Sequence, residues 1–220
     1  MTNRQTCCQC QGIEDRFDTE TGAQKLRAYL RDGPDRTTQL LVGSLRAEGV
    51  ADATLLDIGG GIGAIPLDLL TAGATSATDV DAASGYLAVA REEATRRGYD
   101  SRVTYRHGDF VALAGELESA DIVTLDRVVC CYPDMRALVG ASSAHARRLY
   151  GLVYPRDTWW TRLGGRIGNA LLALTRRSFR FFVHPTGDVD AVIQSNGLRP
   201  TYQRDAGLLW QVVVYSRPAA

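Results

Sequence analysis

From residue 53 onward, short apolar runs alternate along the chain with segments whose apolar residues recur every three or four positions. The runs have the length of β-strands, and the periodic segments have the spacing of amphipathic helices. We predict strands at 53–59, 74–81, 102–110, 120–126 and 147–155. We predict helices at 13–31, 35–49, 63–74, 83–98 and 134–146. Such alternation with short connections indicates a parallel sheet with helices on both faces.

The end of the chain departs from this alternation. A helix is predicted at 184–197, and strands at 198–204 and 208–216 flank the turn Asp205–Gly207. Strands joined by so short a turn pair antiparallel. The predicted fold class is therefore α/β, with a Rossmann-like, seven-stranded mixed sheet that ends in an antiparallel hairpin. We expect one domain at 35–220, preceded at 1–34 by an N-terminal lid segment and helix.

The stretch Asp57–Ala64 reads DIGGGIGA and joins the first predicted strand of the sheet to a helix. Its glycines let the backbone turn tightly, so that the N–H groups of the helix face a bound nucleotide. A dinucleotide would place its pyrophosphate there, and the carboxylate of Asp57 would repel it. The same carboxylate attracts the ammonium and sulfonium groups of S-adenosylmethionine (SAM). The loop therefore favours SAM as the ligand.

Two further acids follow the second and third strands. Asp81 stands where either class of nucleotide-binding fold places an acid on ribose hydroxyls, so it indicates a nucleoside without choosing between the two ligands. Asp109 can accept a hydrogen bond from an adenine amino group, and the backbone N–H of Phe110 can serve a ring nitrogen. The C-terminal hairpin also suits a methyltransferase sheet better than a dehydrogenase sheet.

These motifs, in this order, resemble those of class I SAM-dependent methyltransferases. The resemblance covers roughly residues 30–216 and is carried by LLDIGGGIGAIPLDLL, DVDAASGYLAVAREEA, HGDF and DIVTLDRVVCCYP. It implies an enzyme of the EC 2.1.1 class with SAM as cofactor. The implied cofactor contacts are Gly59, Gly61 and Gly63 on SAM, Asp81 on its ribose and Asp109 on its adenine, with Asp126 and Arg127 where cofactor and acceptor meet.

A closer similarity, to magnesium-protoporphyrin IX O-methyltransferases, is carried by LYGLVYPRDTWW, RIGNALL, FFVHPTGDVDAVI and the lid segment GIEDRFD. It implies a magnesium porphyrin as one candidate acceptor. The chain departs from that family after the fourth strand, where CCYPD replaces an aromatic-His segment. It departs again in the lid, where Arg16 or Phe17 stands in place of a Tyr. The family's candidate acid–base groups are therefore not reproduced.

Four side chains are candidates for catalysis, namely Asp126, Cys131, Tyr132 and His184. Methyl transfer requires alignment of donor and acceptor, together with proton removal when the acceptor is a hydroxyl. A carboxylate or thiolate acceptor needs no base. A lone Tyr or His at a strand end is more often a structural residue, which is the alternative for Tyr132 and His184, and His184 before Pro185 also fits a turn.

All five cysteines lie in two clusters: Cys7, Cys8 and Cys10 near the N-terminus, and Cys130 with Cys131 after the fourth strand. Ligands of open α/β sheets bind outside the carboxyl ends of the strands, so the second cluster is expected to face the site. Three interpretations of the cysteines are open. They are small core residues, or they are ligands of a soft metal or metalloid such as zinc or trivalent arsenic, or one of them is a redox group. Adjacent cysteines do not match the spaced pairs of a zinc finger, so we predict no metal.

The segment 154–182 is rich in arginine and aromatic residues. We expect a helix that packs through Leu163, Ile167 and Leu171 and leaves its arginines in solvent. Alternatively it grips an anionic substrate, or lies on a membrane surface as a basic amphipathic helix. We expect Trp159 and Trp160 near the acceptor pocket.

The composition of the chain limits which binding partners and which cellular location we expect. The formal net charge is +0, so there is no long-range attraction to nucleic acid. The N-terminus lacks the apolar core of a signal peptide and no apolar run is long enough to span a bilayer, so we expect a cytoplasmic protein with reduced thiols.

The predicted function is SAM-dependent methylation of a small-molecule acceptor. The alternatives are methylation or binding of a thiol or soft metalloid through the cysteines, methylation of a magnesium porphyrin, and SAM binding without catalysis; the oligomeric state stays open.

Overall fold

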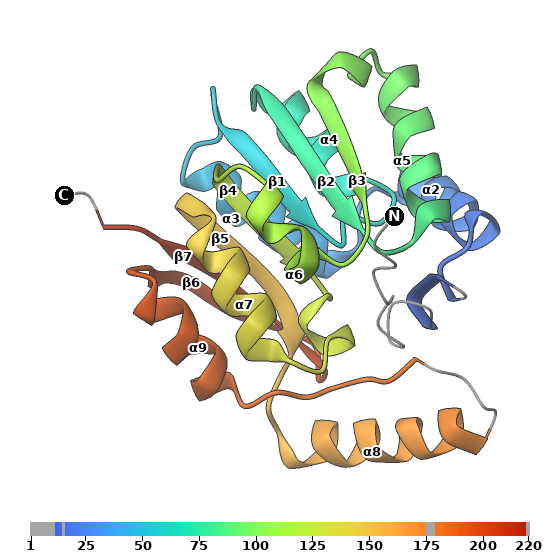
Figure 1. The fold of residues 1–220 in the computed structure, drawn as a ribbon, viewed down its shortest axis with the longest axis vertical. Coiled ribbons are helices and arrows are strands. Elements are labelled where there is room, and N and C mark those ends of the chain that lie inside the picture. Colours follow the sequence, from blue (N-terminus) through green and yellow to red (C-terminus); the bar gives the residue numbers. More distant parts are fainter. Residues whose placement is uncertain (1–11, 15, 175–178, 219–220) are drawn as a thin grey trace.

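The computed structural model describes residues 12–14, 16–174 and 179–218. Within them, seven strands form one sheet in the order β3-β2-β1-β4-β5-β7-β6 (Figure 1). The strands are β1 Thr54–Ile58, β2 Ser76–Asp81, β3 Val103–His107, β4 Ala120–Asp126, β5 Ala146–Pro155, β6 Arg199–Ala206 and β7 Trp210–Ser216. Strands β1 to β5 are parallel, and β7 lies antiparallel between β5 and β6. The predicted fold class, with its C-terminal antiparallel hairpin, is confirmed.

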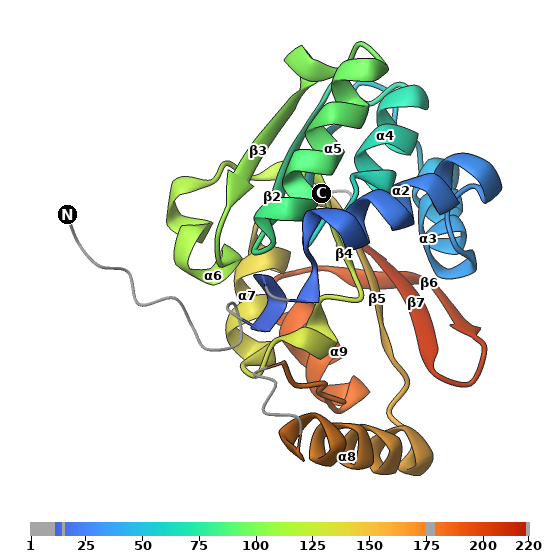
Figure 2. The same ribbon diagram turned by 90° about the vertical axis from the view of Figure 1, so that its right-hand side faces the viewer.

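Helices cover both faces of the sheet (Figures 1 and 2). They are α2 Thr19–Asp32, α3 Arg36–Ala47, α4 Ala64–Thr71, α5 Ser84–Arg96, α6 Phe110–Leu113, α7 Met135–Ala144, α8 Trp159–Leu174 and α9 Thr186–Ser195. Leu55 of β1 belongs to the core layer that contains Leu41 of α3 and Leu67 of α4. Its neighbour Leu56 belongs to the opposite layer, with Leu138 of α7. Since successive strand residues point to opposite faces, the adjacent leucines of β1 fill both layers.

The N-terminal helices begin where an aspartate caps them. Asp35 accepts hydrogen bonds from the N–H groups of Thr37 and Thr38, as expected for the helix predicted at 35–49. The helix predicted at 13–31 becomes regular only at Thr19, because Asp18 accepts from the N–H of Thr21 at 2.8 Å. The described residues before Asp18 therefore form a separate segment that leads into α2.

Helix α8 does not pack as predicted. Leu163, Ile167 and Leu171 are 48%, 54% and 59% exposed, so the expectation that they bury the helix is wrong. The helix is instead held on its other side, where the amide of Asn169 bonds both the backbone N–H and the carbonyl of Phe181. The periodicity of the apolar residues correctly placed them on one face, but that face points to solvent.

Candidate functional site

The candidate site lies where the strand order reverses, at the carboxyl ends of β1 and β4. The glycine loop between β1 and α4 turns there, and Gly61 has a φ of +61°, which glycine adopts without strain. The N–H of Gly61 donates to Asp81 Oδ2 at 2.9 Å, and the N–H of Ala83 donates to Asp81 Oδ1 at 2.8 Å. Asp81, at the end of β2, therefore fixes the loop against the start of α5. Burial raises the pKa of its carboxyl.

Two buried carboxyls lie directly beneath this loop. Asp57 and Asp79 are register partners on β1 and β2, and both are almost fully buried. Asp57 Oδ1 accepts from the hydroxyl of Thr124 at 2.6 Å, while Asp57 Oδ2 and both Asp79 oxygens have no hydrogen-bond partner among the described residues. Burial raises the pKa of Asp57 to about 8, and burial beside Asp57 raises that of Asp79. The pair therefore favours a shared proton over two negative charges.

Sequence reasoning missed Asp79. The signal was present, because Asp79 and Asp81 are two residues apart on one strand and so share a face of the sheet. A charged residue inside an otherwise apolar, doubly covered strand is expensive unless it has a function or a partner.

The structure brings two predicted residues together at the ends of β3 and β4. Asp109 caps α6 by accepting from the N–H of Val111, and its two oxygens lie 3.2 and 3.0 Å from the hydroxyl of Tyr132. The ring of Phe110 is buried and packs edge-on against His145 at 5.8 Å between centroids. The side chain of Phe110 therefore belongs to the core, and the role predicted for this residue concerns its backbone N–H alone.

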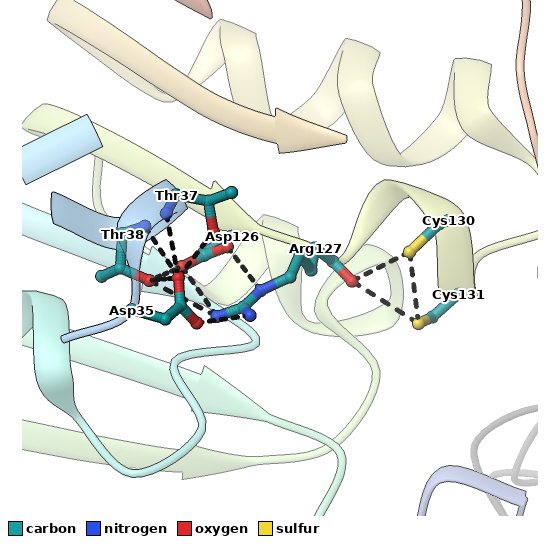
Figure 3. A network of polar contacts seen from close by, with 7 residues as sticks. All are labelled: Asp35, Thr37, Thr38, Asp126, Arg127, Cys130 and Cys131. Atoms are coloured by element: carbon teal, nitrogen blue, oxygen red, sulfur yellow. Dashed lines mark hydrogen bonds and ion pairs between the residues drawn. The ribbon is translucent and has the colours of Figure 1, made fainter. Parts of the chain in front are cut away.

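Asp126 and Arg127, at the end of β4, join a network with the start of α3 (Figure 3). Asp126 Oδ2 accepts from the hydroxyl of Thr38 at 2.5 Å, and Asp126 Oδ1 accepts from Arg127 Nε at 2.9 Å. Arg127 Nη1 lies 2.5 Å from Asp35 Oδ2, so the guanidinium bridges two carboxylates. Burial raises the pKa of Asp126, although Arg127 opposes the shift. Arg127 also has a φ of +62°, a conformation that is rare outside glycine and frequent at functional sites.

The carbonyl of Arg127 faces the cysteine pair (Figure 3). The sulfurs of Cys130 and Cys131 lie 3.2 and 3.5 Å from that oxygen and 3.8 Å from each other. The contact with Cys131, together with burial, raises the pKa of the Cys130 thiol, while the contact with Cys130 and the nearby charge of Arg16 lower that of Cys131. Cys130 is a buried core residue, and Cys131 is the more exposed of the two.

Of the five cysteines considered as ligands of a soft metal or metalloid, the structure describes Cys130 and Cys131. No group of three or more His, Cys, Asp or Glu side chains in the described part of the chain could hold a metal ion. Cys7, Cys8 and Cys10, the other cysteines considered as ligands, lie outside the described residues.

His184 connects two segments rather than standing alone. Its Nε2 lies 2.9 Å from the backbone oxygen of Tyr132, and its ring stacks on Phe182 at 5.9 Å between centroids. The contact with a carbonyl requires Nε2 to carry the proton. This arrangement holds the segment after α8 against the loop that follows β4, as expected of the structural alternative for His184.

An aromatic and cationic cluster beside the glycine loop was not predicted. The ring of Phe17 lies 5.4 Å from that of Tyr86 and 6.2 Å from that of Phe179. Lys25 Nζ lies over Phe17 and Tyr86 at 5.6 and 5.5 Å, and the guanidinium of Arg16 lies over Phe179 at 5.0 Å. The sequence held one signal, because Lys25 is the lone lysine in a chain of 25 basic residues.

The segment before α2 also contacts the start of α5. Glu14 accepts from the backbone and hydroxyl of Ser84 at the start of α5, and lies 3.2 Å from His107 Nε2. The hydroxyl of Tyr86 is buried without a hydrogen-bond partner among the described residues. A buried polar atom of this kind fits a ligand that completes its hydrogen bonding.

Comparisons with known proteins give the same architecture. Residues 55–148 match a family described as methyltransferase domain. Among solved structures, the magnesium protoporphyrin IX methyltransferase from Synechocystis PCC 6803 with bound SAH is 19% identical with a TM-score of 0.73, covering 96% of this chain and 100% of that one. The geranyl diphosphate C-methyltransferase from Streptomyces coelicolor A3(2) is 13% identical with a TM-score of 0.63, covering 82% of this chain and 76% of that one. A comparison with curated proteins found no match.

Proposed function

We propose that this chain is a class I SAM-dependent methyltransferase that transfers a methyl group from SAM to a small planar, anionic acceptor. The observation that carries the proposal is that Asp81 accepts hydrogen bonds from the N–H groups of Gly61 and Ala83 and so holds the glycine loop in place. The loop lies where the strand order of the sheet reverses. The ligands in the neighbouring structures support SAM as the donor, since one is described with SAM and others with SAH.

The residues present fit a cationic nucleoside. Asp57, Asp81 and Asp126 bring three carboxyls to the ends of adjacent strands, where an ammonium or sulfonium group is attracted and a pyrophosphate is repelled. Within this proposal, Gly59, Gly61 and Gly63 admit the cofactor to the backbone. Asp81 binds the ribose hydroxyls, and Asp109 with the N–H of Phe110 binds the adenine. SAM supplies the activated methyl group, and the protein supplies alignment and the exclusion of water.

The acceptor class follows from the Phe17, Tyr86 and Phe179 rings with Lys25 and Arg16 over them. Aromatic faces bind a planar molecule, and the two cations bind a carboxylate on it. Tyr132, hydrogen-bonded to Asp109, is the candidate base for a hydroxyl acceptor, whereas a carboxylate acceptor needs none. A magnesium porphyrin is the specific candidate, because the Synechocystis enzyme covers nearly the whole chain with the same fold.

A mass-shift screen with SAM tests the proposal. We expect planar aromatic acids, including magnesium protoporphyrin IX, to gain a methyl group, and we expect simple thiols and arsenite to gain none. Lys25→Gln is expected to raise the KM for the acceptor about tenfold, the loss of roughly 1.4 kcal/mol, while SAH affinity stays unchanged. Methylation of arsenite that Cys131→Ser abolishes would instead establish the metalloid alternative, and no transfer to any acceptor despite SAM binding would favour a non-catalytic module.

SAM affinity is expected to increase as the pH rises from about 6 to 7.5. Without cofactor, burial and neighbouring acids raise the pKa of Asp57 to about 8, so the carboxyl is mostly protonated in this range. The cationic cofactor stabilises the carboxylate and lowers that pKa, so binding releases a proton and gains up to tenfold in affinity per pH unit. Calorimetry in two buffers of different ionisation enthalpy measures both quantities. Asp57→Asn should remove the dependence, and a flat or falling profile in the wild-type protein would contradict the assignment.

A further inference from the structure

Helix α8 presents a continuous apolar face to solvent. Trp159, Trp160, Leu163, Ile167, Leu171 and Leu174 form what we call the α8 stripe, and all six are exposed, Trp159 at 72% and Leu174 at 82%. At 100° per residue, the six positions fall within about 120° of the helix circumference. The residues that attach α8 to the body, buried Thr161 and Asn169, lie on the other side. The stripe is therefore one contiguous apolar surface and not a set of isolated exposed side chains.

The stripe continues onto the turn between β6 and β7. Trp160 Nε1 donates to the carbonyl of Leu208 at 3.5 Å, and the side chain of Leu208 is 78% exposed. Figures 1 and 2 show α8 at one end of the molecule, with the tip of the β6–β7 hairpin near its N-terminal end. The exposed Leu208 thus lies next to Trp160, at the N-terminal end of the α8 stripe.

Positive charge flanks the stripe. On α8 itself, Arg162 pairs with Asp157, with its Nε 2.5 Å from Asp157 Oδ1, and Arg166 forms no ion pair with the described carboxylates. Arg162 and Arg166 lie on the flank of α8 next to the stripe, where with Asn169 and Phe181 they line a groove of about 320 Å³. An apolar face bordered by arginine, with tryptophans at one end, has the composition of a helix that lies in a membrane interface.

We propose that α8 docks this protein on the surface of an anionic phospholipid bilayer, with the α8 stripe among the acyl chains and Arg166 at the phosphates. The helix lies in the interface and does not cross it, because no helix within the described ranges is long and apolar enough to span a membrane. Charge disfavours a second copy of the chain as the occupant. Two antiparallel α8 helices joined through their stripes would bring their Arg162 and Arg166 flanks together.

Docking through α8 connects the bilayer to the candidate site. The chain enters α8 from the carboxyl end of β5 and returns past the loop that contains Cys130 and Cys131. There the N–H of Phe182 donates to the carbonyl of Cys130 at 2.8 Å. Asn169 ties the same returning segment to the inner side of α8. The segment that returns from α8 thus contacts both the lipid-facing helix and the loop of Cys130, which the proposed function places at the acceptor pocket. This arrangement suits an acceptor that partitions into membranes.

Co-sedimentation of the full chain with vesicles tests this proposal. Vesicles of equal parts phosphatidylcholine and phosphatidylglycerol should bind the protein at least tenfold more tightly than phosphatidylcholine alone, with a shift of tryptophan fluorescence to shorter wavelength. The double variant Leu163→Glu/Ile167→Glu should lose at least tenfold in the partition coefficient. Leu30→Glu, at a leucine of α2 that is 47% exposed, is the matched control and should bind as the wild type does. Circular dichroism and SAH binding establish that each variant is folded.

Three results would overturn the proposal. The first is no binding of the wild-type protein to anionic vesicles. The second is equal binding by the folded double variant. The third is a stable dimer in light scattering that the double variant dissociates, because the α8 stripe would then be an interface between copies of the chain. None of these readouts depends on methyl transfer, so the proposal fails or stands separately from the proposed function.

Discussion

Replacing Gly60 with alanine is expected to lower the free energy of unfolding by about 3 kcal/mol and to abolish measurable SAM binding. An added Cβ would overlap Asp79 Oδ1 and lie 2.9 Å from Asp57 Oδ2. Both carboxyls are buried in the sheet and cannot move aside without opening the strand ends. Since the glycine loop would have to move away from the sheet, the groups proposed to hold the cofactor would lose their positions.

The matched control is Gly43→Ala on α3, where nothing lies within 4 Å of the added Cβ. It should stabilise the protein by up to about 1 kcal/mol, because alanine favours a helix interior over glycine. The double variant Gly60→Ala/Asp79→Gly should recover part of the lost stability, since it removes the carboxyl that the new methyl group meets. Urea denaturation measures all three. A Gly60→Ala variant as stable as the wild type would show that the loop does not rest on the buried acids.

Replacing Asp81 with alanine is expected to weaken SAM binding about 100-fold, or roughly 3 kcal/mol. In the structure Asp81 accepts from the N–H groups of Gly61 and Ala83, and in the proposed complex it also accepts from ribose hydroxyls. The variant therefore loses ligand contacts and the order of the loop together. Calorimetric titration with SAM measures the affinity.

Asp121→Ala separates the binding role from a structural one. Asp121 also accepts a hydrogen bond from a backbone N–H, that of Thr54 at 2.8 Å. It lies, however, at the opposite end of the strands, where β1 and β4 begin. Its loss should reduce stability and leave SAM affinity unchanged. If both variants lowered affinity equally, Asp81 would act only through the general stability of the sheet.

The sequence predicted those parts of the fold that depend on local pattern. The bounds of β4 agree with the predicted strand at 120–126, because the strand is mostly apolar, as expected of one covered on both faces, and ends at a charged residue. The cap at Asp35 and the hairpin after α9 follow in the same way from side-chain chemistry and turn length.

Features that depend on tertiary neighbours were missed. Periodicity showed that Leu163, Ile167 and Leu171 share a face, but it does not reveal whether another element covers that face. The cluster of Phe17, Lys25 and Tyr86 joins the lid segment to α2 and α5, and only the packing of these elements brings the three residues together. The role of Arg127 as a bridge between Asp35 and Asp126 was missed for the same reason, since it joins two distant segments.

Isothermal titration calorimetry with SAM and with NAD⁺ on the same preparation tests the central claim most directly. The carboxyls of Asp57, Asp81 and Asp126 at the glycine loop predict that SAM binds at one site per chain and that NAD⁺ gives no heat of binding. Binding of NAD⁺ at this loop, or no binding of SAM at any concentration reached, would contradict the account.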